Sequence, residues 1–409
     1  MNARKQRRSI AFFGLFGVSN LGNEASLRAA IQVVRRLDPD ADLSCICHYP
    51  EAVEREHGIA AYSFHMAGRL DRWHEGPRWR WMLARPLVEL NRWLTAFRFL
   101  RSVDLVIIPG TGILDDFGVR PWQMPYVLYR WSLLTRLTRT KLAYVAVGAG
   151  PIHERANRWL MRAAVGHADE CSYRDEGSRE FMASIGRDTS RDRVVPDIAF
   201  ALTPPADDTA RNRPTTVGLG VMAYYGWENS SARGAAVYRR YVDTVAEIGR
   251  RLLDLGYSVR LLVGEGTDQE AVDDLTPLLT TGPTADRAHV ETGHIDTMDE
   301  LFHEIALTDI VVATRYHNVV AALIMGRPTV SAGYAEKNRW LLADVGLDGH
   351  CQSVDTMDPD RIVASVSALL ADRDEHVERI RKQTTSWRNE VEAELARVIG
   401  ATSTRTGTR

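Results

Sequence analysis

Three side chains that could bind an anion and move a proton follow one another closely in the sequence. Arg315 and His317 are two residues apart, and Lys337 lies in the next connection. An arginine fork can hold a carboxylate or a phosphate through two parallel hydrogen bonds, whereas lysine supplies a compact positive charge. A histidine with an ordinary pKa of about 6.5 exchanges protons near neutral pH. The pattern predicts a site for an anionic substrate with a general acid or base beside it.

A strand that passes directly into a helix is expected to position two of these residues. The run 309–313 is short, apolar and β-branched, which predicts a buried strand, and 318–325 predicts a packed helix. We expect Thr314 to cap that helix, so that Arg315 and His317 occupy its first turn. Free backbone N–H groups and the helix dipole favour an anion at such a place.

The third residue is expected at the same edge of the sheet. Residues 327–333 predict the next strand, and Lys337 follows it. If the two strands are parallel neighbours, Lys337 lies beyond the edge that carries Arg315 and His317, where open α/β sheets bind ligands. Each residue alone is equally consistent with a helix cap or a solvated loop cation; the three together favour a ligand site.

Length and composition predict a globular protein of two domains. The chain has 409 residues, 45% of them hydrophobic, and a net charge of −2, which gives no overall field to attract nucleic acid. Four cysteines are sparse and lack the CxxC spacing of a zinc site, and no clustered His/Asp/Glu ligand set is apparent, so no metal is expected. The apolar run near the N-terminus is too short for a signal peptide, and no stretch reaches the roughly 20 apolar residues that span a bilayer.

A glycine- and asparagine-rich turn follows the first predicted strand, 9–16. It carries Asn20, Asn23 and Glu24 and leads into a predicted helix, 25–37. Strand, glycine-rich turn and helix form the first unit of a nucleotide-type fold. The glycine spacing differs from GxGxxG, so the dinucleotide fingerprint is absent. The turn either presents its polar groups to a ligand or is purely structural.

Further turns are expected at the same edge of the first sheet. Strand 104–109 is followed by a glycine turn with Asp115, and strand 141–149 ends in a second one. Arg174 follows a short strand that begins at Glu170. Residues 194–200 predict another strand, which carries Asp197.

The polar, proline-bearing stretch 203–215 is the best linker candidate, and a second series of alternating strands and helices follows it. The expected domains are residues 1–205, 206–375, and a closing helix with a disordered tail at 376–409. Alternating strands and helices predict an α/β fold of two Rossmann-like domains, with parallel sheets facing a central cleft. Arg174 would line one wall of that cleft, and Arg315, His317 and Lys337 the other.

Segment 69–101 is rich in arginine and tryptophan, with eight Arg and four Trp against three acidic residues. It predicts helical pieces broken near Pro77 and Pro86. Tryptophan and arginine on one amphipathic surface are typical of a helix that lies at a membrane interface. The alternative, which we favour, is a helix that covers the sheet and solvates its arginines.

With these motifs assembled, the chain resembles the polysaccharide pyruvyl transferase family, whose fold is similar to the two-domain GT-B glycosyltransferases. The resemblance covers roughly residues 10–347. It rests on Asn20–Glu24 (NLGNE), Gly110–Asp115 (GTGILD), Val147–Gly150 (VGAG), Arg174-Asp175, Pro196-Asp197, and Arg315-Tyr316-His317 with the downstream Lys337. One departure is at Asn23. This chain has Gly-Asn-Glu here, whereas the family pattern is similar to Gly-Asp-Glu.

The resemblance implies transfer of the pyruvyl group of phosphoenolpyruvate onto two sugar hydroxyls, with formation of a cyclic ketal and release of phosphate. It implies donor binding or catalysis for Arg174, Arg315, His317 and Lys337. We expect His317 to be the general acid or base, assisted by Arg315, and we expect no cofactor. The candidates on the acceptor side are Asn20, Asn23, Glu24, Asp115 and Asp197.

The expected partners are phosphoenolpyruvate and a saccharide acceptor, lipid-linked if segment 69–101 contacts a membrane. The expected place is the cytoplasm, or the inner face of the membrane. Two alternatives stay open: a GT-B-type glycosyltransferase that uses a nucleotide sugar, and a non-catalytic protein that binds glycan or phosphate. The acceptor sugar, the bridged hydroxyls and the oligomeric state are not specified by these motifs.

Overall fold

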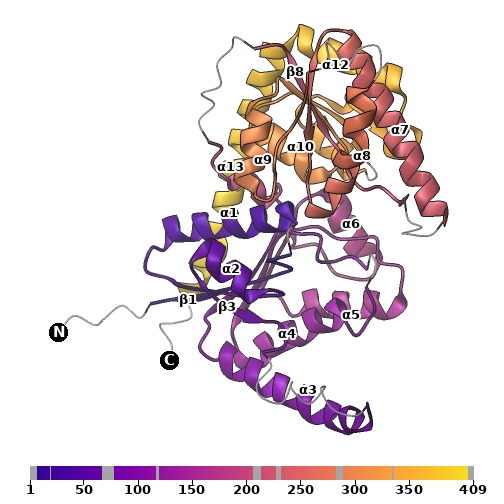
Figure 1. The fold of residues 1–409 in the computed structure, drawn as a ribbon. Coiled ribbons are helices and arrows are strands. Elements are labelled where there is room, and N and C mark those ends of the chain that lie inside the picture. Colours follow the sequence, from indigo (N-terminus) through magenta and orange to yellow (C-terminus); the bar gives the residue numbers. More distant parts are fainter. Residues whose placement is uncertain are drawn as a thin grey trace. The chain divides into compact units, whose positions relative to one another are not determined.

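The computed structural model describes residues 7–18, 20–66, 78–116, 119–205, 213–226, 232–281, 289–333 and 336–403 (Figure 1). The contacts divide the chain into two units. The first unit comprises Met1–Val18, Asn23–Ala201 and Arg388–Arg409, and the second comprises Ser19–Gly22 and Leu202–Trp387.

The first unit is built on a parallel seven-stranded sheet with the order β3-β2-β1-β4-β5-β6-β7. Its strands are apolar and mostly buried, as expected where helices cover both faces of a sheet. They are β1 (Ser9–Phe13), β2 (Asp42–Cys47), β3 (Ala60–Ser63), β4 (Leu105–Pro109), β5 (Lys141–Val147), β6 (Glu170–Tyr173) and β7 (Arg193–Val194).

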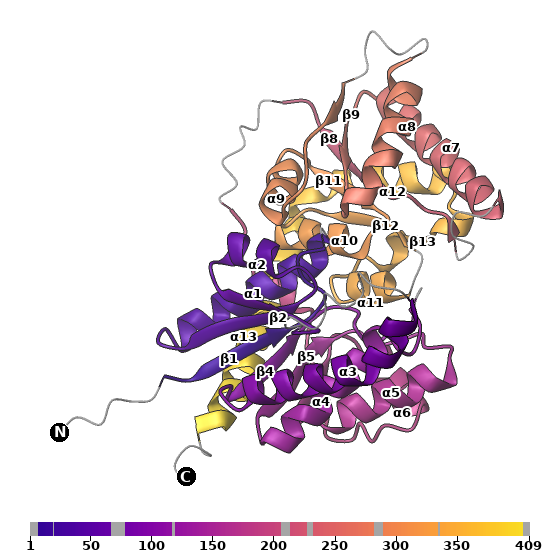
Figure 2. The same cartoon turned by 60° about the horizontal axis from the view of Figure 1, so that its bottom comes forward.

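Helices cover both faces of this sheet, because the strand order reverses between β1 and β4 and crossovers between parallel strands are right-handed as a rule. Figure 2 shows α1 and α2 on one face and α3, α4 and α5 on the other. The helices are α1 (Leu21–Leu37), α2 (Pro50–His57), α3 (Arg78–Leu100), α4 (Met124–Thr138), α5 (Arg155–Gly166) and α6 (Glu176–Ser184). The core lies between the sheet and α3, α4 and α5, around Phe13, Trp131 and Tyr144.

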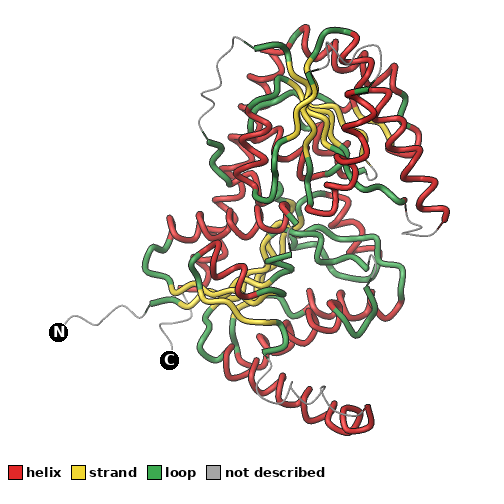
Figure 3. Tube along the Cα trace, viewed as in Figure 1, coloured by secondary structure: helices red, strands yellow, loops and turns green. Residues whose placement is uncertain are grey.

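The second unit has a parallel six-stranded sheet with the order β10-β9-β8-β11-β12-β13. Helices again cover both faces (Figure 3). The strands are β8 (Thr216–Gly220), β9 (Ser258–Leu262), β10 (Val290–Thr292), β11 (Ile310–Ala313), β12 (Thr329–Gly333) and β13 (Cys351–Ser353). The helices are α7 (Ala232–Asp254), α8 (Gln269–Thr280), α9 (Met298–Ala306), α10 (Tyr316–Ile324), α11 (Lys337–Ala343), α12 (Pro359–Ala371) and α13 (Arg373–Ser403).

The predicted α/β class with parallel sheets is therefore confirmed. The first unit changes to the second at Ala201–Leu202, four residues before the expected boundary at 205/206, and the second unit continues to Trp387 within α13. The expected linker, 203–215, lies partly outside the described residues. Helix α13 runs to Ser403, and residues 404–409, where the rest of the expected tail falls, lie outside the described residues.

Two predicted elements are wrong. Residues 194–200 do not form one strand, because β7 ends at Val194 and a 3-10 helix occupies Ile198–Ala201. Pro196 lacks an N–H for the strand ladder, and Oδ1 of Asp197 accepts a hydrogen bond from the Ala199 N–H at 3.1 Å, which closes a turn instead. Helix α3 also continues through Pro86, where a break was expected. The expected break near Pro77 lies outside the described residues.

One face of α3 packs against α4 through a polar contact. Glu89 accepts hydrogen bonds from the Tyr126 hydroxyl at 2.8 Å and from the buried guanidinium of Arg130 at 2.9 Å. The favoured interpretation of this segment as a covering helix is thus correct for this face. None of the described helices has the length and hydropathy needed to cross a bilayer.

Candidate active site

The junction between β11 and α10 gathers the chemistry that the sequence singles out in the second unit. β8 and β11 are neighbours at the point where the strand order reverses, and ligands of open α/β sheets bind outside the carboxyl ends of strands at such points. β11 also pairs in parallel with β12, as expected. Residues that follow β11 and β12 therefore lie beyond one edge of the sheet.

Arg315, not Thr314, is the N-cap of α10, so the predicted cap is wrong by one residue. The Thr314 hydroxyl instead lies 3.1 Å from the hydroxyl of Tyr241, which is buried in α7. Burial raises the pKa of Tyr241 to about 12, so this phenol stays neutral and can share its proton with Thr314. Tyr316 and His317 are the first two residues of the helix.

The guanidinium of Arg315 is held by two carboxylates that precede α8. Nε and Nη2 donate to the two oxygens of Asp268 at 2.9 and 2.6 Å, and Nη1 lies 3.1 Å from Oε2 of Glu265. Asp268 is fully buried, whereas the Glu265 side chain is 27% exposed. Arg315 is therefore a fixed and partly neutralised cation rather than an isolated one.

Tyr316 connects the other two predicted residues. The ammonium of Lys337 lies 5.2 Å from the centre of its ring, within the range of a cation–π contact. The imidazole of His317 approaches the edge of the same ring, with ring centres 5.2 Å apart. Lys337 opens α11 directly after β12. The expected juxtaposition of a lysine and a histidine at this sheet edge is thus present.

Two glycines make room for the first turn of α10. A Cβ on Gly220 would lie 2.7 Å from Nδ2 of Asn318, and one on Gly264 would lie 2.8 Å from Oδ1 of the same amide. Asn318 is fully buried between these two strand ends. The Cβ on Gly264 would also lie 3.1 Å from Cγ of Arg315, so the absence of a side chain there sets the position of both residues.

In the first unit, Arg174 follows β6 and lies against Gly148, where a Cβ would lie 2.6 Å from its guanidinium. Its Nη1 donates to Asp197 at 3.4 Å, and its Nε lies 3.5 Å from Asp175. The Asp197 side chain is fully buried. Asp197 therefore helps to hold Arg174 in place, and its role on the acceptor side stays a prediction.

The other acceptor-side candidates are mostly engaged in the turn after β1. Nδ2 of Asn23 donates to the Leu15 carbonyl at 3.0 Å, and Oε1 of Glu24 accepts from the Gly17 N–H at 2.7 Å. Asn20 forms an isolated bridge with Glu265, and both are grouped with the second unit. Asp115 is half-buried in the turn after β4. The roles of these residues on the acceptor side stay predictions.

The sequence analysis missed the residues that hold the expected ones in place. Asp268, Glu265 and Tyr241 carry no motif, and their partners come from other elements. One signal exists for the two acids: they follow β9, and residues that follow parallel strands lie at one edge of the sheet.

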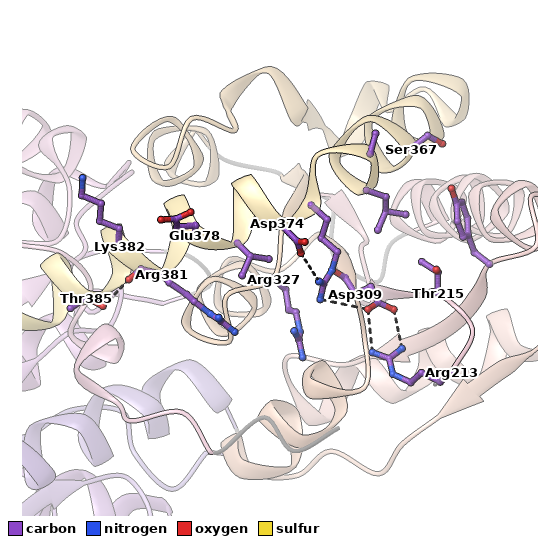
Figure 4. Close-up of a pocket in the computed structure, with 15 residues that line it drawn as sticks. Arg213, Thr215, Asp309, Arg327, Ser367, Asp374, Glu378, Arg381, Lys382 and Thr385 are labelled. Atoms are coloured by element: carbon purple, nitrogen blue, oxygen red, sulfur yellow. Dashed lines mark hydrogen bonds and ion pairs between the residues drawn. The ribbon is translucent and has the colours of Figure 1, made fainter. Parts of the chain in front are cut away.

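A cavity of about 1320 Å³ lies at the opposite edge of the second sheet (Figure 4). Thr215 and Asp309, which line it, directly precede β8 and β11. Its charged groups pair with one another, since Asp309 lies 3.0 Å from Arg213 and 3.6 Å from Arg373. This cavity is therefore separate from the site at the carboxyl ends.

The chain matches the model of one protein family, described as polysaccharide pyruvyl transferase, over residues 20–336. Among solved structures, it is similar to UDP-GlcNAc 2-epimerase from Neisseria meningitidis bound to UDP-GlcNAc, with a TM-score of 0.60, 10% identity, and 96% of this chain and 99% of that chain covered. It is also similar to Anabaena HepE in complex with UDP and glucose, with a TM-score of 0.58, 14% identity, and coverage of 97% and 99%. At these identities the likeness shows the fold alone, which is GT-B-like, as expected.

Proposed function

Because the chain belongs to the polysaccharide pyruvyl transferase family, we propose that it transfers the pyruvyl group of phosphoenolpyruvate onto two hydroxyls of one saccharide unit. The products are a cyclic ketal and inorganic phosphate. The observation that carries the proposal is the gathering of Arg315, His317 and Lys337 at the carboxyl edge of the second sheet, around the N-terminus of α10. No cofactor enters the proposed reaction.

Phosphoenolpyruvate carries a carboxylate and a phosphate, so its site needs more than one cation. Lys337 and Arg315 supply charge, and the positive end of the α10 dipole adds to it. Asp268 is fully buried and holds Nε and Nη2 of Arg315, whereas Glu265 is partly exposed and faces Nη1. We infer that the donor anion replaces Glu265 on Arg315 while Asp268 keeps the guanidinium oriented. Arg174, similarly anchored by Asp197, is the proposed cation of the first unit.

In the proposed reaction, a proton is added to the enol methylene carbon, which becomes the methyl group of the ketal. The first sugar hydroxyl then attacks C2 and loses its proton, and a second hydroxyl displaces phosphate at the same carbon. His317 is the proposed general acid, because imidazole exchanges protons near neutral pH and a bound phosphate favours its protonated form. Asp115, Asp197 and Glu24 are the candidates to accept a proton from the acceptor.

Calorimetry of the purified protein with phosphoenolpyruvate, UDP and GDP tests the donor. We expect binding of phosphoenolpyruvate that is lost in Arg315→Ala. The matched control is Arg240→Ala, which removes an exposed arginine from the surface of α7. Nucleotide binding without any response to phosphoenolpyruvate would instead identify a glycosyltransferase.

Phosphate release in the presence of saccharide acceptors tests the role of His317. His317→Ala should lower kcat by about 100-fold or more while the affinity for phosphoenolpyruvate changes little, as expected for a general acid. His303→Ala, at an exposed position of α9, is the control. An equal loss of affinity with unchanged turnover would assign His317 to donor binding.

We further propose that the protein works at the cytoplasmic face of a membrane, on a lipid-linked acceptor, and that α3 contacts the lipid. Leu87, Leu90 and Leu94 are 62, 54 and 44% exposed and share one helix face by their spacing. Arg85 and Arg98 are exposed on either side of them. An apolar stripe flanked by arginines is typical of helices that bind anionic lipid surfaces.

Flotation with vesicles that contain anionic lipid tests this contact. Leu90→Ser combined with Leu94→Ser should reduce the bound fraction, whereas Leu278→Ser, at an exposed leucine of α8, should not. Binding that is the same for neutral and anionic vesicles, or that persists in the double variant, would contradict the proposed contact of α3 with lipid.

A further inference from the structure

Two buried polar atoms of the first unit face each other across a gap. Oε2 of Glu24 and Nε2 of His57 lie 3.9 Å apart, and their side chains are only 10 and 6% exposed. Neither atom has a hydrogen-bond partner among the residues that the structure describes. Buried polar atoms nearly always have one, and an exception calls for an ordered water or an ion.

A third potential ligand adjoins the pair. Oε1 of Glu56 lies 4.0 Å from Nε2 of His57. One ligand atom from each of Glu24, Glu56 and His57 lies within 4.8 Å of the other two. The sequence analysis found no ligand cluster because Glu24 is far from the other two along the chain, and only the packing of α1 on α2 brings them together.

Both sides of the gap are held in place by hydrogen bonds. The other oxygen of Glu24, Oε1, accepts from the Gly17 N–H at 2.7 Å and so fixes the turn after β1. On the other side, α2 ends at His57 with Gly58 in the left-handed conformation, and the His57 carbonyl accepts from Arg35 at 3.2 Å. The two facing atoms thus belong to elements that are already anchored.

We propose that Glu24, Glu56 and His57 bind one divalent transition-metal ion, which joins the first turn of α1 to the end of α2. Zinc binds imidazole nitrogen and carboxylate oxygen at about 2.0–2.2 Å, so two ligand atoms on one ion lie at most about 4.2 Å apart, and about 3.4 Å apart in a tetrahedral site. The two separations from Nε2 of His57, 3.9 and 4.0 Å, fall within that limit. All three ligand atoms lie within 4.8 Å of one another, so the two carboxylates have to move closer together to bind one ion.

The donor set defines the class of ion. One imidazole and two carboxylates suit Zn²⁺, Mn²⁺ or Fe²⁺, whereas Mg²⁺ and Ca²⁺ prefer oxygen ligands throughout. The nearby thiol of Cys45 is not part of the set. The ligand atoms that lie within 4.8 Å of one another come from Glu24, Glu56 and His57.

Calorimetry with Zn²⁺ on the full chain, freed of metal beforehand, tests the site. We expect one saturable equivalent whose affinity falls at least about tenfold in both Glu24→Gln and His57→Gln. Glutamine at position 24 still offers an oxygen to the Gly17 N–H, so the turn can keep its hydrogen bond. Glu51→Gln, at an exposed position in the first turn of α2, is the matched control and should leave the affinity unchanged.

Two further measurements distinguish a metal site at Glu24, Glu56 and His57 from binding elsewhere. Zn²⁺ should raise the melting temperature of the parent protein and of Glu51→Gln, but not of His57→Gln. Co²⁺ should give the visible absorption bands of a nitrogen and oxygen site. The proposal is overturned if no saturable binding occurs, if His57→Gln binds as tightly as the parent, or if an intense near-ultraviolet band places the ion on a cysteine. In each of those cases Glu24 and His57 form an ion pair only.

Discussion

Asp268 accepts two hydrogen bonds from Arg315, from Nε at 2.9 Å and from Nη2 at 2.6 Å, and so fixes the plane of the guanidinium at the N-terminus of α10. The carboxylate is itself fully buried and accepts two further bonds, from the Ala223 N–H at 3.1 Å and from the Gly264 N–H at 3.4 Å. A buried carboxylate with four donors is anchored to several parts of the second unit. Arg315 is therefore oriented before any ligand arrives, which lowers the entropy cost of binding.

Replacement of Asp268 by Asn tests this anchoring. The amide offers one acceptor where the carboxylate offered two, so we expect the free energy of unfolding to fall by about 2 kcal/mol. The affinity for phosphoenolpyruvate should fall as well, because Arg315 loses its fixed orientation. Urea unfolding and calorimetry measure the two effects.

The control for this change is Asp273→Asn, at an exposed position of α8. It also removes one negative charge, and it should change neither the free energy of unfolding nor the affinity for phosphoenolpyruvate. Tighter binding of phosphoenolpyruvate by Asp268→Asn would mean that Asp268 competes with the donor for Arg315 rather than positioning it.

Gly264→Ala should disturb the same site from the other side. The new Cβ would lie 2.8 Å from Oδ1 of Asn318 and 3.1 Å from Cγ of Arg315, so one of the two side chains has to move. We expect a loss of about 1–3 kcal/mol in unfolding free energy and weaker binding of phosphoenolpyruvate. Gly349→Ala is the control, because a Cβ there meets nothing within 4 Å. An unchanged affinity in Gly264→Ala would show that the position of Arg315 tolerates this shift.

The alternation of apolar runs and glycine turns was enough to predict two α/β units, each with a parallel sheet. It also predicted the sheet edge that carries Arg315, His317 and Lys337. That prediction succeeded because strand polarity alone decides at which edge a residue following a strand lies. Partners could not be predicted, because they depend on packing between distant segments. Thr314 has the ideal residue type for a cap, yet its hydroxyl is taken by Tyr241 from α7.

The partners of the acceptor-side residues could not be predicted for the same reason. Asp197 reads as an available carboxylate in the sequence, but the buried turn after β7 commits it to Arg174 and to the Ala199 N–H. Glu24 appears as one acid in a polar turn, and only the fold places His57 opposite its free oxygen. Residue type predicted the chemistry available, while tertiary contacts decided which groups are occupied.

Asn23 departs from the Gly-Asp-Glu pattern that the resemblance implies, and its hydrogen bond explains why asparagine suits this chain. Nδ2 donates to the Leu15 carbonyl at 3.0 Å, and an ionised aspartate has no hydrogen to donate. Asn23→Asp should therefore lower the free energy of unfolding by about 1–2 kcal/mol near neutral pH. Denaturant unfolding measures the change, with the exposed Asn389→Asp as its control. Equal stability of the two variants would show that the turn after β1 does not depend on this bond.

His350 gives the stability a dependence on acid. Burial, followed by the charge of His376, lowers its pKa below the ordinary 6.5, while Asp348 opposes the shift. Since the folded protein binds this proton less tightly than the unfolded chain does, His350 contributes stability above about pH 6.5 that is lost as the pH falls through its lowered pKa.

The fall in unfolding free energy between about pH 7 and pH 5 should therefore be smaller in His350→Gln than in the parent protein. We expect a difference below about 1 kcal/mol, because the imidazole is only partly shielded from solvent. Urea unfolding at several pH values measures it, and His303→Gln, at an exposed position of α9, should keep the slope of the parent. If the unfolding free energy of His350→Gln falls as steeply with acid as that of the parent, other groups cause the acid dependence and the neutral state of His350 contributes nothing to it.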